Sequence, residues 1–142
     1  MSIQKITLLV GLPGSGKTTL GNFFIESYKG NGKVLFIDDI GVKANDAKSY
    51  LSNLDKEIEW LIISDVYFCK KEVLTQAKEL LNNLYPNIDI EVLFFENSPE
   101  KCLYNIKKRI ESGDDRKVEG LVKSLSKNYD ISSTKTLKIK NK

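Results

Sequence analysis

The segment from Gly11 to Thr18 constrains the fold of this chain more than any other. It reads Gly-Leu-Pro-Gly-Ser-Gly-Lys-Thr, and its glycines allow the backbone to curl tightly. The apolar run Ile6 to Val10 precedes it and suits a strand buried on both faces. Residues 18–29 follow with apolar side chains at helical spacing. Strand, glycine-rich turn and helix in this order match the pattern GxxxxGK[ST] in full and predict a phosphate-binding loop.

Each part of this loop has an expected role in binding a nucleoside triphosphate, ATP or GTP, with Mg²⁺. Backbone amides and the positive end of the following helix would face the phosphates. Lys17 would reach the β- and γ-phosphates, and Thr18 would give its hydroxyl to Mg²⁺. The predicted nucleotide-binding residues are Gly11, Pro13, Gly14, Ser15, Gly16, Lys17, Thr18 and Thr19.

The rest of the chain alternates apolar strands with helical patterns. Such alternation predicts βαβ units, that is, an α/β fold with a mostly parallel sheet and helices on both faces. The length of 142 residues fits one domain, residues 1–142. The expected strands are 6–10, 34–37, 60–65, 90–95 and an edge strand at 136–139, and the expected helices are 18–29, 44–58, 71–84, 98–111 and 118–129.

Composition narrows the available chemistry. The chain has no histidine, which excludes His-based triads and His metal ligands, so carboxylates, Lys, Tyr or Cys must handle protons. Cys69 and Cys102 lack CxxC spacing and are expected to be small buried residues. The net charge of +3 is compatible with a phosphate-rich partner and equally with a solvated surface.

Carboxylates follow two of the expected strands. In parallel sheets ligands bind beyond the carboxyl ends of the strands, which is where Asp65 follows the strand at 60–64. Asp65 is expected to hold the Mg²⁺ shell through water, with a helix cap or turn as the alternative. Asp38 is the expected base for an attacking hydroxyl, with Asp39 as its alternative and a plain turn pair as another.

These motifs together resemble a known family. The loop written G-x-P-G-S-G-K-T, the Asp38-Asp39 pair and the strand-to-helix stretch 94–109 resemble the P-loop kinase group, specifically the phage-type polynucleotide 5′-hydroxyl kinase domain and its small viral relatives. The resemblance implies a three-layer P-loop NTPase fold with a five-stranded sheet in the order 2-3-1-4-5. It also implies in-line transfer of the γ-phosphoryl group of ATP to a hydroxyl.

The family carries arginines that clamp the ATP phosphates on the helix after the fourth strand. Tyr104 stands where the first of them is expected, and the second falls at Lys108 or Arg109. By this resemblance Arg109 is the predicted catalytic arginine, while Lys108 and Arg116 are further candidates for ATP contacts. The family also places a basic residue shortly after the Asp pair, where it holds the phosphate of the acceptor. In the stretch 40–43 only Lys43 could take that role. Lys107, Lys108 and Arg109 could instead form a solvated helix face.

The sequence thus predicts an ATP-dependent kinase whose favoured acceptor is the 5′-hydroxyl of a polynucleotide. Alternatives are a kinase of a nucleoside, nucleotide or other small molecule, and a nucleotide-binding regulatory protein without transfer activity. A GTPase switch is disfavoured because no NKxD-type guanine motif is present. No signal peptide and no apolar run of about 20 residues is recognisable, so a cytoplasmic location is expected, in the host cytoplasm if the protein is viral.

Overall fold

A parallel sheet organises the structure, a computed structural model that describes residues 3–39, 47–113, 118–131 and 135–141. Five strands pair in the order β2-β3-β1-β4-β5, and every pairing is parallel. The predicted P-loop NTPase fold and its strand order are therefore confirmed. The strands are β1 (Lys5–Val10), β2 (Lys33–Asp38), β3 (Ile58–Ser64), β4 (Ile90–Phe95) and β5 (Thr136–Leu137).

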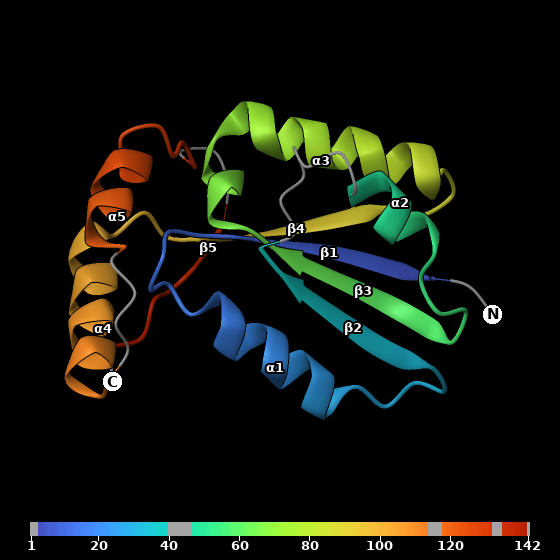
Figure 1. The fold of residues 1–142 in the computed structure, drawn as a ribbon, viewed down its shortest axis with the longest axis horizontal. Helices are drawn as coiled ribbons and strands as arrows, with labels where there is room; N and C mark the ends of the chain where they lie inside the picture. Colours follow the sequence, from blue (N-terminus) through green and yellow to red (C-terminus); the bar gives the residue numbers. More distant parts are fainter. Residues whose placement is uncertain (1–2, 40–46, 114–117, 132–134, 142) are drawn as a thin grey trace.

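Helices cover both faces of this sheet, as Figure 1 shows. One helix, α1, lies against one face, and α2 and α3 lie against the other. The last two helices, α4 and α5, pack against each other near the carboxyl end of the sheet. The helices are α1 (Lys17–Ser27), α2 (Ala47–Ser52), the 3₁₀ helix η1 (Val66–Cys69), α3 (Lys71–Leu84), α4 (Pro99–Glu111) and α5 (Glu119–Ser126).

Two apolar clusters fill the space between these layers. The larger one joins β1 to α3, whose Val73, Ala77 and Leu81 repeat at helical spacing on the buried side. The smaller one lies under α1, where Trp60 packs its ring 5.0 Å from that of Phe24. Because β1 and β3 are covered on both faces, most of their residues are apolar.

The helix expected over 44–58 is wrong in extent. Residues 44–46 lie outside the described part of the chain, and α2 ends at Ser52. A polar turn then intervenes, in which the Asp55 carboxylate accepts a hydrogen bond of 2.9 Å from the Glu57 amide. Asp competes in this way with helical bonding, so the chain turns and enters β3 at Ile58, two residues before the predicted strand.

The last helix and strand are also shorter than predicted. The helix expected over 118–129 ends at Ser126, and Tyr129 instead turns inward, where its hydroxyl donates to the Val10 carbonyl at 3.2 Å and to the Phe95 carbonyl. The predicted edge strand exists only as Thr136–Leu137. It stops there because the Glu96 carboxylate, not a neighbouring strand, accepts from the Ile139 amide at 2.8 Å.

No helix among the described residues is both long and apolar enough to cross a membrane.

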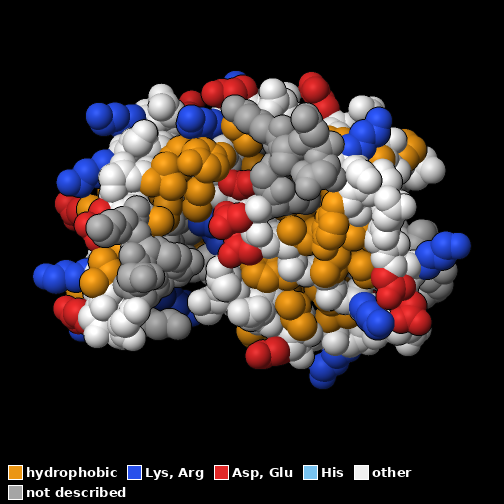
Figure 2. Space-filling model, viewed as in Figure 1, with side chains coloured by type: hydrophobic (Ala, Val, Ile, Leu, Met, Phe, Trp, Pro, Cys, Tyr) orange, Lys and Arg blue, Asp and Glu red, His pale blue; other side chains and the backbone are white. Residues whose placement is uncertain are grey.

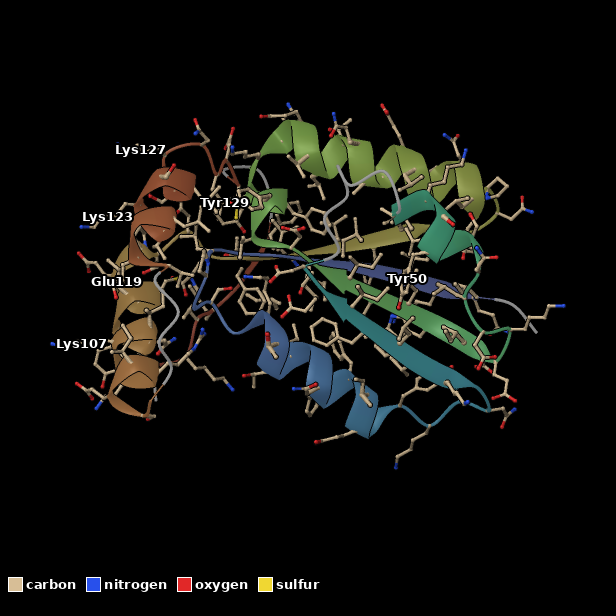
Figure 3. The ribbon with its side chains drawn as sticks, viewed as in Figure 1. Tyr50, Lys107, Glu119, Lys123, Lys127 and Tyr129 are labelled. Atoms are coloured by element: carbon tan, nitrogen blue, oxygen red, sulfur yellow. The ribbon has the colours of Figure 1, made fainter. Side chains whose placement is uncertain are left out.

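Removal of the Tyr129 hydroxyl tests the link that this residue makes between β1, β4 and the segment after α5. Tyr129→Phe takes a donor from two buried carbonyls and is expected to lower the free energy of unfolding by about 1–3 kcal/mol, as measured by urea denaturation. Tyr50→Phe is the control, because Tyr50 lies on α2 with 53% of its surface exposed; Figure 3 labels both residues. Equal stability of the two variants would contradict the assignment.

Candidate nucleotide site

The loop between β1 and α1 has the shape that its sequence predicts. Leu12 to Ser15 form a turn closed by a hydrogen bond of 3.1 Å from the Ser15 amide to the Leu12 carbonyl. Pro13 occupies the second position and Gly14, with φ of 85°, the third, which is the pattern of a type II turn. Gly16, with φ of 108°, then leads into α1. Both glycines therefore adopt left-handed conformations that other residues rarely take.

Helix α4 backs this loop directly. A Cβ atom added to Gly14 would lie 2.6 Å from the Cys102 carbonyl oxygen and 3.0 Å from the Ile106 side chain. Cys102 and Ile106 are themselves buried, at 0% and 2% exposure. The tip of the loop is thus packed against the inner side of α4, and only a residue without a side chain fits there.

Lys17 lies across the inside of the loop. Its ammonium donates to the carbonyls of Gly11 at 2.7 Å and Leu12 at 2.9 Å, and to the Ser15 hydroxyl at 3.4 Å. Burial lowers the pKa of Lys17, and nearby acidic groups, Asp38 among them, act in the opposite direction. The loop therefore surrounds a buried amine with oxygen atoms, and phosphate oxygens would have to replace some of them.

The strand order brings Asp38 beside the loop. The Asp38 carboxylate accepts from the Thr18 hydroxyl at 3.2 Å and from the Ser64 hydroxyl at 2.7 Å. Thr18 and Asp38 were both predicted from the sequence, and the structure places them in contact. Ser64 was not predicted, although one signal was available: it is a polar residue at the end of a strand that is buried throughout. Figure 2 shows acidic side chains near the centre of this face, where β2 and β3 end in Figure 1.

Asp39 and Asp65 lie at the same edge of the sheet in different settings. Asp39 is exposed, has φ of 55°, and donates its amide to the Ser64 carbonyl at 2.8 Å. Asp65 is 4% exposed, and its carboxylate accepts from the Tyr67 amide at 2.9 Å. Asp65 thereby caps η1, the alternative that the sequence left open, and a role at the metal remains a prediction.

The residues present fit a Mg²⁺ ion bound together with a nucleotide. Among the described residues, no three His, Cys, Asp or Glu side chains are grouped so as to hold a metal by themselves. Mg²⁺ in nucleotide sites uses few protein oxygens and takes its other ligands from phosphates and water. The Thr18 hydroxyl is an oxygen ligand of the kind that this ion accepts, and the Asp38 carboxylate lies 3.2 Å from that hydroxyl.

The basic residues of α4 lie on two sides of the helix. Cys102, Ile106 and Arg109 follow at helical spacing, so half-buried Arg109 continues the stripe that touches the loop. Lys108 lies on the outer side, with its ammonium 5.7 Å from the centre of the Tyr104 ring and 4.0 Å from the Glu111 carboxylate.

Lys107 is exposed and points away from the sheet (Figure 3). Lys43 and Arg116 lie outside the described residues.

Asn105 is a second residue that sequence reasoning missed. Its side-chain amide donates to the Gly14 carbonyl at 3.0 Å. The available signal was its place beside Cys102 and Ile106 on an otherwise apolar stripe, because polar groups there need partners.

The two cysteines are the small buried residues that the sequence predicts. Both are free and buried. Burial raises the pKa of the Cys69 thiol to about 12 and that of the Cys102 thiol to about 11. Both thiols therefore stay protonated at neutral pH and are poor nucleophiles.

Comparison with known proteins identifies one relative by sequence and one by fold. No protein-family model matches the chain. "Uncharacterized protein R277" of Acanthamoeba polyphaga mimivirus is 30% identical over 132 residues, covering 92% of this chain and 89% of that protein. The chain belongs to the family of this mimivirus protein. The membership does not confirm the resemblance to polynucleotide kinases.

One solved structure shares the fold of this chain at low sequence identity, and a second superposes less well. The crystal structure of APE1195 superposes with a TM-score of 0.62 at 15% identity, covering 99% of this chain and 87% of that one. A de novo designed protein with a P-loop NTPase fold gives a TM-score of 0.43 at 17% identity, covering 87% and 91%. The likeness to APE1195 shows a common fold. The chemistry of the site has to be argued from its own residues.

The fit of Gly14 against α4 predicts a local loss on substitution. Gly14→Ala combines a left-handed backbone, costing about 1–2 kcal/mol, with a contact of 2.6 Å to the Cys102 carbonyl. We expect lower stability and at least about tenfold weaker ATP binding, equivalent to roughly 1.4 kcal/mol, by calorimetry. In the control Gly120→Ala a new Cβ meets nothing within 4 Å, so α5 should tolerate it or gain stability. Equal affinity in both variants would refute this description of the loop.

Proposed function

We propose that this chain is an ATP-dependent phosphotransferase that moves the γ-phosphoryl group to a hydroxyl, with the 5′-hydroxyl of a polynucleotide as the favoured acceptor. One domain, residues 1–142, would carry the activity. The observation that carries the proposal is the contact at the loop edge: Asp38 accepts from Thr18, the residue that follows the buried Lys17. A phosphate loop, a metal-binding hydroxyl and a carboxylate then lie within one site.

In phosphoryl transfer the protein takes little part in covalent chemistry. It positions the two substrates and stabilises the charge on the transferred group. Lys17 and the amides of the loop would hold the β- and γ-phosphates, at the start of α1 where the helix dipole is positive. Bound Mg²⁺ would neutralise charge on these phosphates. Thr18 would hold the ion directly, and Asp65 through water. The proposal is supported by the Lys17 ammonium, which contacts three oxygen atoms of the loop, so that its positive charge is already held inside the loop.

Proton transfer from the acceptor hydroxyl would fall to a carboxylate at the end of β2. Asp38 is our proposed base, with Asp39 as the alternative. Asp38 accepts from the hydroxyls of Thr18 and Ser64, so its role could instead be to orient the Thr18 hydroxyl toward Mg²⁺. In that arrangement Asp39, the next residue along the chain, would accept the proton. The two assignments differ in how they respond to Mg²⁺.

Positive charge on the transferred group would come from α4. Arg109, which continues the stripe that contacts the loop, is our proposed clamp. Lys108, on the outer side of α4, and Arg116, which follows α4 in the chain, are the further candidates for contacts to ATP. Tyr104 occupies the position where the kinase family has its first arginine. This substitution favours one second candidate, a regulatory protein that binds the nucleotide without transferring phosphate.

An acceptor panel tests the proposal. Labelled ATP and Mg²⁺ are supplied with a 5′-hydroxyl oligonucleotide, its 5′-phosphorylated counterpart, nucleosides and nucleotides. We expect label on the 5′-hydroxyl oligonucleotide alone among the nucleic acids, and a loss of at least about 100-fold in Lys17→Ala, because a preorganised charge at the phosphates is removed. Lys107→Ala is the control, since Lys107 is exposed and points outward.

The outcomes separate the candidate functions. Label on a nucleoside or nucleotide only would identify a small-molecule kinase. ATP binding without transfer to any acceptor would favour the regulatory protein.

Single-turnover rates measured across a Mg²⁺ titration distinguish the carboxylates. If Asp38 is the base, Asp38→Asn lowers the rate at saturating Mg²⁺ by about 10²–10⁴-fold, the usual contribution of a base, without changing the Mg²⁺ concentration at half-saturation. If Asp38 orients Thr18 instead, the half-saturating Mg²⁺ concentration rises and Asp39→Asn shows the larger loss at saturation. Wild-type behaviour of both variants would contradict hydroxyl activation at the end of β2.

A further inference from the structure

One side chain joins three parts of the chain that are distant in sequence. The side-chain amide of Asn105 donates to the Gly14 carbonyl at 3.0 Å and to the Lys140 carbonyl at 3.0 Å. Its oxygen accepts from the Asn141 side-chain amide at 3.1 Å. An asparagine offers two donor hydrogens and one acceptor oxygen, so these three bonds use each of them. Neither a carboxylate nor an apolar residue of similar size could replace this set.

Residues 138–141 form a docked segment on α4. The Ile139 amide donates to the Glu96 carboxylate at 2.8 Å, and the Ile139 side chain is buried at 5% exposure. The same hydrogen bond, helped by Lys101 at 3.1 Å, lowers the pKa of Glu96. Asn141 also donates to the Lys101 carbonyl at 3.0 Å. Chain ends usually fray unless they are tied down in this way.

The Asn105 bond acts on the peptide between Gly14 and Ser15, in the turn of the loop. Gly14 is the third residue of the turn, and a glycine there can adopt several backbone conformations. Because a peptide unit is planar, the direction of the Gly14 carbonyl also sets the direction of the Ser15 amide. A hydrogen bond from Asn105 to that carbonyl selects one orientation. Cys102 and Ile106 confine Gly14 from the same helix, and such preorganisation lowers the cost of binding a ligand.

We propose that Asn105 is a positioning residue that holds the phosphate loop in its binding shape, and that through it nucleotide affinity depends on the docked segment 138–141. This inference rests on nucleotide binding at the loop, the first step of the proposed function. Coupling is reciprocal, so nucleotide binding must in turn hold the segment more firmly. A partner that drew residues 138–141 away from α4 would weaken nucleotide binding.

Affinity measurements on asparagine variants test the proposal. In Asn105→Ala the Kd for ATP with Mg²⁺ should rise about tenfold, the effect of one or two lost hydrogen bonds. Asn141→Ala keeps the Asn105 side chain, removes one of its partners and should raise the Kd by a smaller factor. Asn53→Ala is the matched control: Asn53 is exposed, directly follows α2 and donates its side-chain amide to the Ser49 carbonyl at 2.7 Å, so the variant should keep the wild-type Kd.

Hydrogen exchange provides a second readout that a purely structural role would not move. Saturating ATP with Mg²⁺ should slow exchange of the 139–141 amides in the wild type and in Asn53→Ala, and much less in Asn105→Ala. Where transfer is measurable, KM for ATP should rise in Asn105→Ala more than kcat falls.

The proposal is overturned if Asn105→Ala and Asn141→Ala both bind ATP with the wild-type Kd, whatever their melting temperatures. It is equally overturned if ATP leaves exchange of the 139–141 amides unchanged in the wild type. Should Asn105→Ala fail to fold, the Kd of Asn141→Ala and the wild-type exchange decide. A wild type that binds no ATP refutes the proposed function together with this inference, whereas a wild type that binds while the variants match it refutes this inference alone.

Discussion

The central position of β1 is the constraint on which the rest of the structure depends. It pairs in parallel with β3 on one side and β4 on the other, and its core residues are fully buried. All carboxyl ends therefore meet at one edge, where the phosphate loop leaves β1. The loop is supported from below by the sheet and from the side by α4, so the glycine-rich turn is held by packing as well as by its own bonds.

The sequence alone was sufficient for the parts of this arrangement that depend on local patterns. Apolar runs predicted β1 and β3, because strands of a parallel sheet that are covered on both faces need apolar residues on both. The run at 90–95 predicted β4 as well, although most of its residues are only half-buried. Helix α4, expected over 98–111, begins at Pro99, and the Ser98 hydroxyl caps it by accepting from the Lys101 amide at 3.4 Å. The Pro13-Gly14 pair is typical of the turn that the loop contains.

What the sequence could not supply are contacts made by distant residues. Asn105 and Gly14 are 91 positions apart, and no local pattern predicts which residue a polar side chain on an apolar stripe will meet. The contact of Asp38 with Thr18 depends in the same way on strand order, which came from the family resemblance. The polar turn at Asp55 is a local feature that the prediction overlooked. Helical spacing of apolar residues continues past α2, but the Asp55 carboxylate accepts from the Glu57 amide and favours a turn over a longer helix.

Helix α4 also limits how a phosphate clamp could work in this protein. Lids in phosphotransferases commonly close over their substrates as moving segments. Here Cys102 and Ile106 are buried against the loop, and Asn105 is bonded to it, so the first two turns of the helix cannot move without disturbing the phosphate site. Arg109 lies about one turn beyond Ile106. If it acts as we propose, its charge would be positioned by packing before substrate arrives, and stabilisation would come from a preorganised charge and not from closure of the whole helix.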